Sequence, residues 1–311
     1  MRAVTLAVAS AALALATMAE AARAEDRTAV LDAPAPPTLP ALAHPTLTDT
    51  FEITVAGIDP GGGKARASAF FLHDEAEYPL ISRKWYVGAA HDVAAGAVPG
   101  TGHDFFLGSP EIWTRGLWSS IVGLSAGGGL GVVVPIPHGL SPGAETIFQT
   151  VRVVRPWDAA YFTDRVLTLR PWIDIRHVVW RFILQLRQGL DVEIAARPLA
   201  PYENRVEYVA ETTFYVGFRL AKPIGVGLEA WEVYQISADL CGATQPCFDD
   251  DRRAAFSVSP SVRLLLGRVE PALSLLFPVA TPLRGEAASY WAARFNVGFD
   301  FDVGGQAGGA P

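Results

Sequence analysis

The chain has 311 residues, of which 50% are hydrophobic and 18% are charged, and its formal net charge is −7. This composition is too apolar for a disordered chain, and the negative charge argues against nucleic acid as a partner. Beyond the N-terminus, no apolar run reaches the roughly 18 residues that a membrane-spanning helix needs, so a helical membrane protein is also excluded.

Residues 1–24 have the pattern of a cleavable secretory signal peptide. Arg2 supplies the positive charge, residues 4–18 form an apolar stretch, and residues 22–24 have the small-x-small pattern of a cleavage site. Residues 25–47 are rich in Pro and Ala and have no periodicity, so we expect an extended periplasmic segment. The sequence therefore predicts an exported protein.

Residues 48–303 form one predicted domain in which apolar and polar residues alternate. This period of two residues is typical of β-strands with one apolar face. Thirteen segments bounded by turn residues have it: 49–58, 65–73, 84–92, 105–117, 119–136, 145–155, 164–176, 178–190, 204–221, 223–237, 254–267, 268–280 and 288–303. Residues 304–311 form a Gly-rich tail.

The length of these segments distinguishes a membrane barrel from a soluble sandwich. Sandwich strands usually have about 5 to 6 residues, whereas a tilted strand that crosses a membrane needs roughly 9 to 11. A sheet in a bilayer must also close on itself, and bacterial barrels normally have an even number of strands. We therefore predict an all-β, up-and-down antiparallel transmembrane β-barrel of about twelve strands. The segment to discard is 105–117, which contains Gly108, Pro110 and Gly116.

Loop lengths predict the orientation of the barrel. The turns at 222–223 and 267–268 are tight, as periplasmic turns are, whereas the connections at 191–203, 238–253 and 281–287 are longer, as outer loops are.

The second of these long connections, residues 238–253, contains the only two cysteines, Cys241 and Cys247. We expect a disulfide between them on the outer side, because an oxidising compartment favours pairing. The pair lacks further nearby ligands for zinc, so no metal site is expected there.

The strand faces opposite the apolar ones carry the candidate functional residues. If the apolar faces meet lipid, these charged residues line the lumen, where they either pair and fill it or select solutes in a polar pore. The lumen candidates are Arg181, Arg187, Glu207, Glu211, Arg219, Glu229, Arg263, Glu270 and Arg294.

Three other motifs have structural interpretations. The Gly-rich stretch 123–131 lacks the Lys and Ser or Thr of a phosphate loop, so we expect a barrel corner or a wall against which another segment packs. The similar stretches 154–158 and 169–174 share Arg-Pro-Trp, and we interpret them as anchors at the membrane interface. The histidines are expected to be polar loop residues, and no metal or other cofactor is predicted.

The last strand carries a motif with a family resemblance. Residues 296–303 have the form polar-x-Gly-x-x-apolar-x-apolar, in which Asn296, Gly298, Phe301 and Val303 fill the defining positions. The chain thereby resembles bacterial outer-membrane β-barrel proteins of the porin or transporter type, whose C-terminal strand is read by the barrel-assembly machinery. The resemblance implies location in the outer membrane, contact with its lipid and recognition by that machinery.

Three functions follow from these patterns. Passive passage of small molecules is the first, either through a pore or by a lateral route for apolar ones. A structural or surface-interaction barrel with a plugged lumen is the second. A lipid-acting barrel enzyme is the third, disfavoured because no His-x-Ser of the kind found in barrel phospholipases occurs in the sequence.

Overall fold

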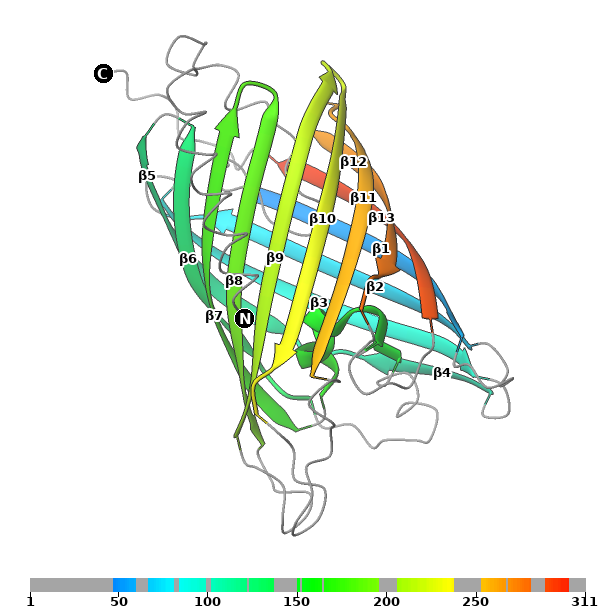
Figure 1. Ribbon diagram of the computed structural model, residues 1–311. Coiled ribbons are helices and arrows are strands. Elements are labelled where there is room, and N and C mark those ends of the chain that lie inside the picture. Colours follow the sequence, from blue (N-terminus) through cyan, green and yellow to red (C-terminus); the bar gives the residue numbers. More distant parts are fainter. Residues whose placement is uncertain are drawn as a thin grey trace.

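A computed structural model describes residues 47–59, 67–80, 84–98, 102–121, 123–136, 150–151, 153–163, 165–195, 206–237, 253–266, 268–280 and 289–301. These residues form a closed antiparallel β-barrel (Figure 1). Strand β1 pairs with both β13 and β2, and the pairing of β2 with β3 completes the ring. The predicted fold class is therefore confirmed.

The strands are long, as the periodicity predicted. Their bounds are β1 (Leu47–Asp59), β2 (Ala67–Pro79), β3 (Trp85–Val98), β4 (Gly102–Leu107), β5 (Glu111–Ile121), β6 (Leu124–Val133), β7 (Val166–Val179), β8 (Phe182–Ala195), β9 (Val206–Ala221), β10 (Ile224–Gln235), β11 (Ala254–Leu264), β12 (Val269–Pro278) and β13 (Ser289–Phe301).

Strands β4 and β5 are two halves of one interrupted strand. Both pair with β3, β4 along residues 93–98 and β5 along residues 85–90. The interruption lies at residues 108–110, where proline cannot donate a ladder hydrogen bond. Counting this interrupted strand once gives the predicted twelve.

The prediction discarded the wrong segment, however. Residues 105–117 do belong to the barrel wall, as parts of β4 and β5. Of residues 145–155, which were predicted as a strand, residues 150–151 and 153–154 are helical. The apolar, β-branched residues of that segment are typical of a buried strand. In so short an apolar run, periodicity alone does not distinguish a buried strand from a buried helix.

The two faces of the sheet divide as the alternation predicted. Along β12 and β13, Leu273 and Trp291 are 56% and 54% exposed on the outside, whereas Ser274 and Arg294 are buried inside. The apolar side chains therefore form the outer surface and the polar ones face the lumen, which is the arrangement of a barrel in lipid.

Neighbouring residues on β2 and β3 interrupt the apolar outer surface. Asp74 and His91 are cross-strand partners and share the outer face, whereas His73 faces the lumen. His73, His91, His103 and His177 all lie within strands, so the expectation of loop histidines is wrong for these four. No helix among the described residues is long and apolar enough to cross a membrane.

The connections at the two ends of the barrel differ in length. Strand pairs β5–β6, β7–β8 and β9–β10 are each joined by two residues, at the end where β1 begins and β13 ends. The strands that meet at the opposite end are separated by longer stretches of sequence, such as residues 134–165 between β6 and β7. The predicted tight turn at 222–223 lies at the end with the two-residue connections, whereas β8 extends to Ala195 and so includes the first part of the predicted loop at 191–203.

Candidate functional site: a plugged lumen

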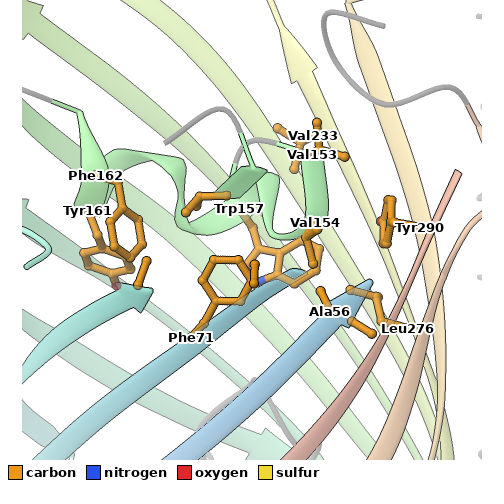
Figure 2. Packing of buried hydrophobic residues seen from close by; sticks show 14 of the residues in the cluster. Ala56, Phe71, Val153, Val154, Trp157, Tyr161, Phe162, Val233, Leu276 and Tyr290 are labelled. Atoms are coloured by element: carbon orange, nitrogen blue, oxygen red, sulfur yellow. The ribbon is translucent and has the colours of Figure 1, made fainter. Parts of the chain in front are cut away.

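A short helical segment lies inside the barrel (Figure 2). It comprises residues 150–151 and 153–162, hereafter the plug, and includes the 3-10 helix η2 (Pro156–Phe162). Pro156 stands at the first helical position, where its missing N–H group costs no helical hydrogen bond. Because six of the seven η2 residues are buried, the plug fills part of the lumen rather than covering it.

Apolar contacts hold one side of the plug to the barrel wall. The indole of Trp157 stacks on that of Trp231, with ring centroids 4.6 Å apart, and the ring of Phe162 contacts that of Phe106 at 5.7 Å. Figure 2 shows the plug side chains among inward-facing residues of the wall. The wall members of this cluster are Ala56, Ile58, Ala69, Phe71, Ala94, Phe106, Val133, Trp231, Val233, Leu276, Tyr290 and Ala292.

A buried ion pair anchors the start of η2. The guanidinium of Arg155 donates hydrogen bonds to Glu52 Oε1 at 2.6 Å and to Asp158 Oδ2 at 2.5 Å. Glu52 also accepts a hydrogen bond from Arg294 Nη2 at 2.7 Å. The carboxylate of Glu52 thus lies between a cation of the plug and a cation of the wall, so this anchor joins the plug to β1 and β13.

A second anchor joins the plug to β7. Arg170 donates to the carbonyl oxygen of Trp157 at 2.9 Å and to the hydroxyl oxygen of Tyr161 at 3.0 Å. The Tyr161 hydroxyl in turn donates to Glu111. Burial and the neighbouring Glu111 carboxylate raise the pKa of Tyr161 well above its ordinary value, so the phenol stays protonated and keeps donating.

The interruption between β4 and β5 provides a third contact. The backbone N–H of Ser109 donates to the carbonyl oxygen of Tyr161 at 2.5 Å, and that of Gly108 donates to the carbonyl of Asp92 at 2.8 Å. The wall therefore turns one of its backbone donors towards the plug where the strand is broken.

A cavity of about 130 Å³ adjoins the plug. Its lining combines plug residues with inward-facing residues of the wall and is rich in charged groups and indoles. It is lined by Thr50, Glu52, His73, Glu75, Glu111, Trp113, Arg155, Trp157, Asp158, Tyr161, Arg170, Pro171, Trp172, Arg187, Gly189, Asp191, Glu211, Thr213, Trp231 and Asn296.

His73 is the histidine of this cavity, and carboxylates engage both of its ring nitrogens. Nδ1 lies 3.1 Å from Asp92 Oδ2, and Nε2 lies 3.4 Å from Glu75 Oε2. A general base for a serine nucleophile needs one ring nitrogen directed at the hydroxyl. His73 therefore has the surroundings of a charge-pairing residue rather than those of a catalytic base.

Most of the lumen candidates face inward as predicted. Arg187 pairs with Asp174 at 2.8 Å and Arg263 pairs with Glu270 at 3.1 Å. Arg294 and Glu229, whose side chains are fully buried, lie 3.5 Å apart. The inward-facing candidates within the strands also include Glu207 and Glu211.

Two candidates lie at the rim instead. Arg181 is exposed in the turn between β7 and β8, with its guanidinium 5.3 Å from the ring centroid of Trp180, so its prediction as a lumen residue is wrong. Arg219 lies near the end of β9 and donates to the carbonyl oxygen of Lys222 at 2.8 Å. Strand alternation predicts the face of a residue but not its distance from the end of the barrel.

Apart from Arg294, the residues that hold the plug were not among the predicted candidates. Glu52, Arg155, Tyr161 and Arg170 come from segments far apart in the sequence, which no local pattern connects. One signal was available, because Arg155 and Arg170 belong to the two Arg-Pro-Trp stretches. Their interpretation as interface anchors is wrong, since both arginines point into the lumen and contact the plug or are part of it.

The Gly-rich stretch forms most of β6 and lies beside crowded lumen side chains. A Cβ atom on Gly131 would overlap Glu111 Oε1, and one on Gly129 would overlap the indole of Trp172. These glycines therefore allow the close approach of side chains from β5 and β7. The Gly-rich stretch forms a wall, as one of the two predictions stated. The groups that pack against it are side chains of the neighbouring strands β5 and β7.

The remaining predicted features lie partly outside the described residues. In the C-terminal motif, Asn296 is buried and donates to Glu52, while Phe301 is 47% exposed at the end of β13. Gly298 lies between them on the same strand. Val303 lies outside the described residues, as do Cys241 and Cys247, residues 1–24 with the predicted signal peptide, and residues 304–311.

Comparisons place the fold among known barrels. No protein-family model and no curated protein matches the sequence. The COG4313 outer membrane channel from Pseudomonas putida F1 matches 86% of this chain and 100% of its own, with a TM-score of 0.60 and 7% identity. The KdgM porin has a TM-score of 0.43 and 9% identity over 81% of this chain and 99% of its own. The β-domain of the Bordetella autotransporter BrkA has a TM-score of 0.46 and 10% identity over 82% of this chain and 100% of its own.

At 7% identity, the likeness to the Pseudomonas channel concerns the fold and not the activity. It agrees with the closed sheet, the apolar outer surface and the polar lumen. The chain therefore has the fold of a bacterial outer-membrane β-barrel, with an internal plug.

Proposed function

We propose that the protein is an outer-membrane channel for the passive passage of small molecules, and that movement of the plug opens its lumen. The observation that carries this proposal is that the barrel is complete without the plug. Every strand pairs with its neighbours around the ring, and the plug contributes no strand. A segment that is docked on the wall can leave while the barrel persists.

The polarity of the lumen supports a path for water and solutes. Among the described residues of the barrel wall, eight Asp or Glu residues and two Arg residues are buried. Keeping ionised groups away from water is unfavourable unless they are well paired, and well-packed apolar residues would often be as stable. A wall of this polarity suits a lumen that water enters when the plug moves.

A structural barrel with a permanently closed lumen is the second candidate. The apolar cluster between plug and wall favours it, because the stacked indoles of Trp157 and Trp231 bury a large apolar surface. In that case the plug stays in place, and the long loops at the outer end carry the function. The lipid-acting enzyme has less support, because both ring nitrogens of His73 face carboxylates.

Recording in planar lipid bilayers separates the first two candidates. The test compares the full-length protein with a variant in which residues 150–162 are replaced by a Gly/Ser linker of equal length. We expect brief openings from the native protein and steady conductance from the variant. Heat-modifiable gel mobility confirms that the variant has folded. A folded variant without conductance would overturn the channel and favour the structural barrel.

A further inference from the structure

The cavity beside the plug has more carboxylates than cationic groups in its lining. Six carboxylates line it, and they stand against three guanidiniums and the imidazole of His73. The carboxylates are those of Glu52, Glu75, Glu111, Asp158, Asp191 and Glu211, and the guanidiniums are those of Arg155, Arg170 and Arg187.

Each guanidinium is already engaged by carboxylates. Arg170 is shared by three of them, Glu111 at 3.1 Å, Asp191 at 2.9 Å and Glu211 at 3.1 Å. These acids come from β5, β8 and β9, so the single positive charge of Arg170 pairs with carboxylates on three strands of the wall. Arg187 is held by Asp174, on the neighbouring strand β7, through two hydrogen bonds. The arginines are therefore poorly placed to attract an additional anion.

Movement of the plug leaves this excess in place. Arg155 and Asp158 both belong to the plug and leave together, as one positive and one negative charge. The wall of the cavity then keeps five carboxylates against two guanidiniums and one imidazole. Glu75 is the least compensated of these carboxylates, because its ion-pair partner is His73 at 3.4 Å rather than an arginine.

We infer that the open lumen passes small cations in preference to anions, with Glu75, Asp191 and Glu211 as the residues that set this selectivity. This inference rests on the proposed channel function. Carboxylates that surround a narrow passage with walls of low dielectric constant concentrate cations there and repel anions. The indoles of Trp113 and Trp172 in the same lining add faces that attract organic cations.

The test measures the reversal potential of the Gly/Ser-linker variant in a KCl gradient across a planar bilayer. We expect the sign that corresponds to a K⁺/Cl⁻ permeability ratio above unity. Conductance with a ratio at or below unity would overturn the inference and leave the channel intact. Absence of conductance from the folded variant would overturn the channel, and the inference with it.

Single substitutions in the same variant identify the residues responsible. Glu75→Gln removes a lumen charge whose direct ion-pair partner is His73 rather than an arginine, and should lower the permeability ratio. Glu232→Gln is the matched control, since it makes the same chemical change on the exposed outer face of β10. Equal effects of the two substitutions would contradict the assignment to the lumen. Glu211→Gln gives a second test, because it retains the shape of the group next to Arg170.

Discussion

Trp157 of the plug stacks on Trp231 of strand β10, with ring centroids 4.6 Å apart and ring planes 14° from parallel. The Arg294 guanidinium lies 5.1 Å from the Trp231 centroid, so the stack adjoins the ionic anchor of the plug. Apolar and ionic contacts thus hold the same short segment.

Trp231→Ala should release the plug while leaving the barrel folded. Truncation of a buried Trp to Ala costs about 3–5 kcal/mol, and here the loss falls on the contact between plug and wall. Hydrogen–deuterium exchange of the plug amides should accelerate. The control is Trp291→Ala, because Trp291 is 54% exposed on the outer surface. Equal exchange of the plug in both variants would contradict the role of the stack.

Arg155→Ala should loosen the plug by leaving Glu52 and Asp158 without their shared cation. Removing one partner of a buried ion pair typically costs about 3–5 kcal/mol. The frequency of channel openings in planar bilayers should rise. Arg115→Ala serves as the comparison, because it breaks the buried pair with Glu77 in the wall, away from the plug. It should lower barrel stability in urea without increasing openings.

The plug should respond to strongly alkaline pH through Tyr161. Its pKa is raised by burial and by Glu111, so the protonated phenol is favoured in the plugged state. The resulting stabilisation is complete below the ordinary tyrosine pKa of about 10 and is lost as pH rises through the raised value. The protection of the plug amides, corrected for their base-catalysed intrinsic exchange, should therefore fall only as the pH rises above about 10. Tyr161→Phe should abolish this alkaline step, and its persistence would show that another group is responsible.

Gly131→Ala should impair barrel assembly. The added methyl group would overlap the carboxylate of Glu111, which the Tyr161 hydroxyl and Arg170 hold in place. Gly116→Ala is the matched control, because its Cβ would make an ordinary 3.5 Å contact with Trp85. Heat-modifiable mobility and the midpoint of urea unfolding compare the two. Similar midpoints would mean that β6 does not need glycine at this position.

The cysteine pair tests the orientation of the barrel. Strands β10 and β11 are joined at the end with the long connections, and Cys241 and Cys247 lie between these strands in the sequence. A membrane-impermeant thiol reagent should label intact cells only after reduction. Labelling without reduction would exclude the disulfide, and labelling only after cell lysis would reverse the orientation.

Much of the barrel could be predicted from the alternation of residue types. Leu273 and Ser274 lie on opposite faces because successive side chains of a strand point in opposite directions. The same rule correctly placed Arg187, Glu229 and Arg294 in the lumen. It failed at Arg181, because a turn has no strand face, and at residues 150–155, because apolar β-branched residues suit a buried helix as well as a strand.

The sequence alone determined that the chain forms long strands with one apolar face, which a bilayer forces into a closed barrel. The tertiary structure decided what occupies the lumen. Arg155 meets Glu52, 103 positions away along the chain, and Arg170 meets Glu211, 41 positions away. Periodicity reports the local direction of a side chain, whereas these pairings depend on the closure of the sheet, which brings distant strands around the same segment.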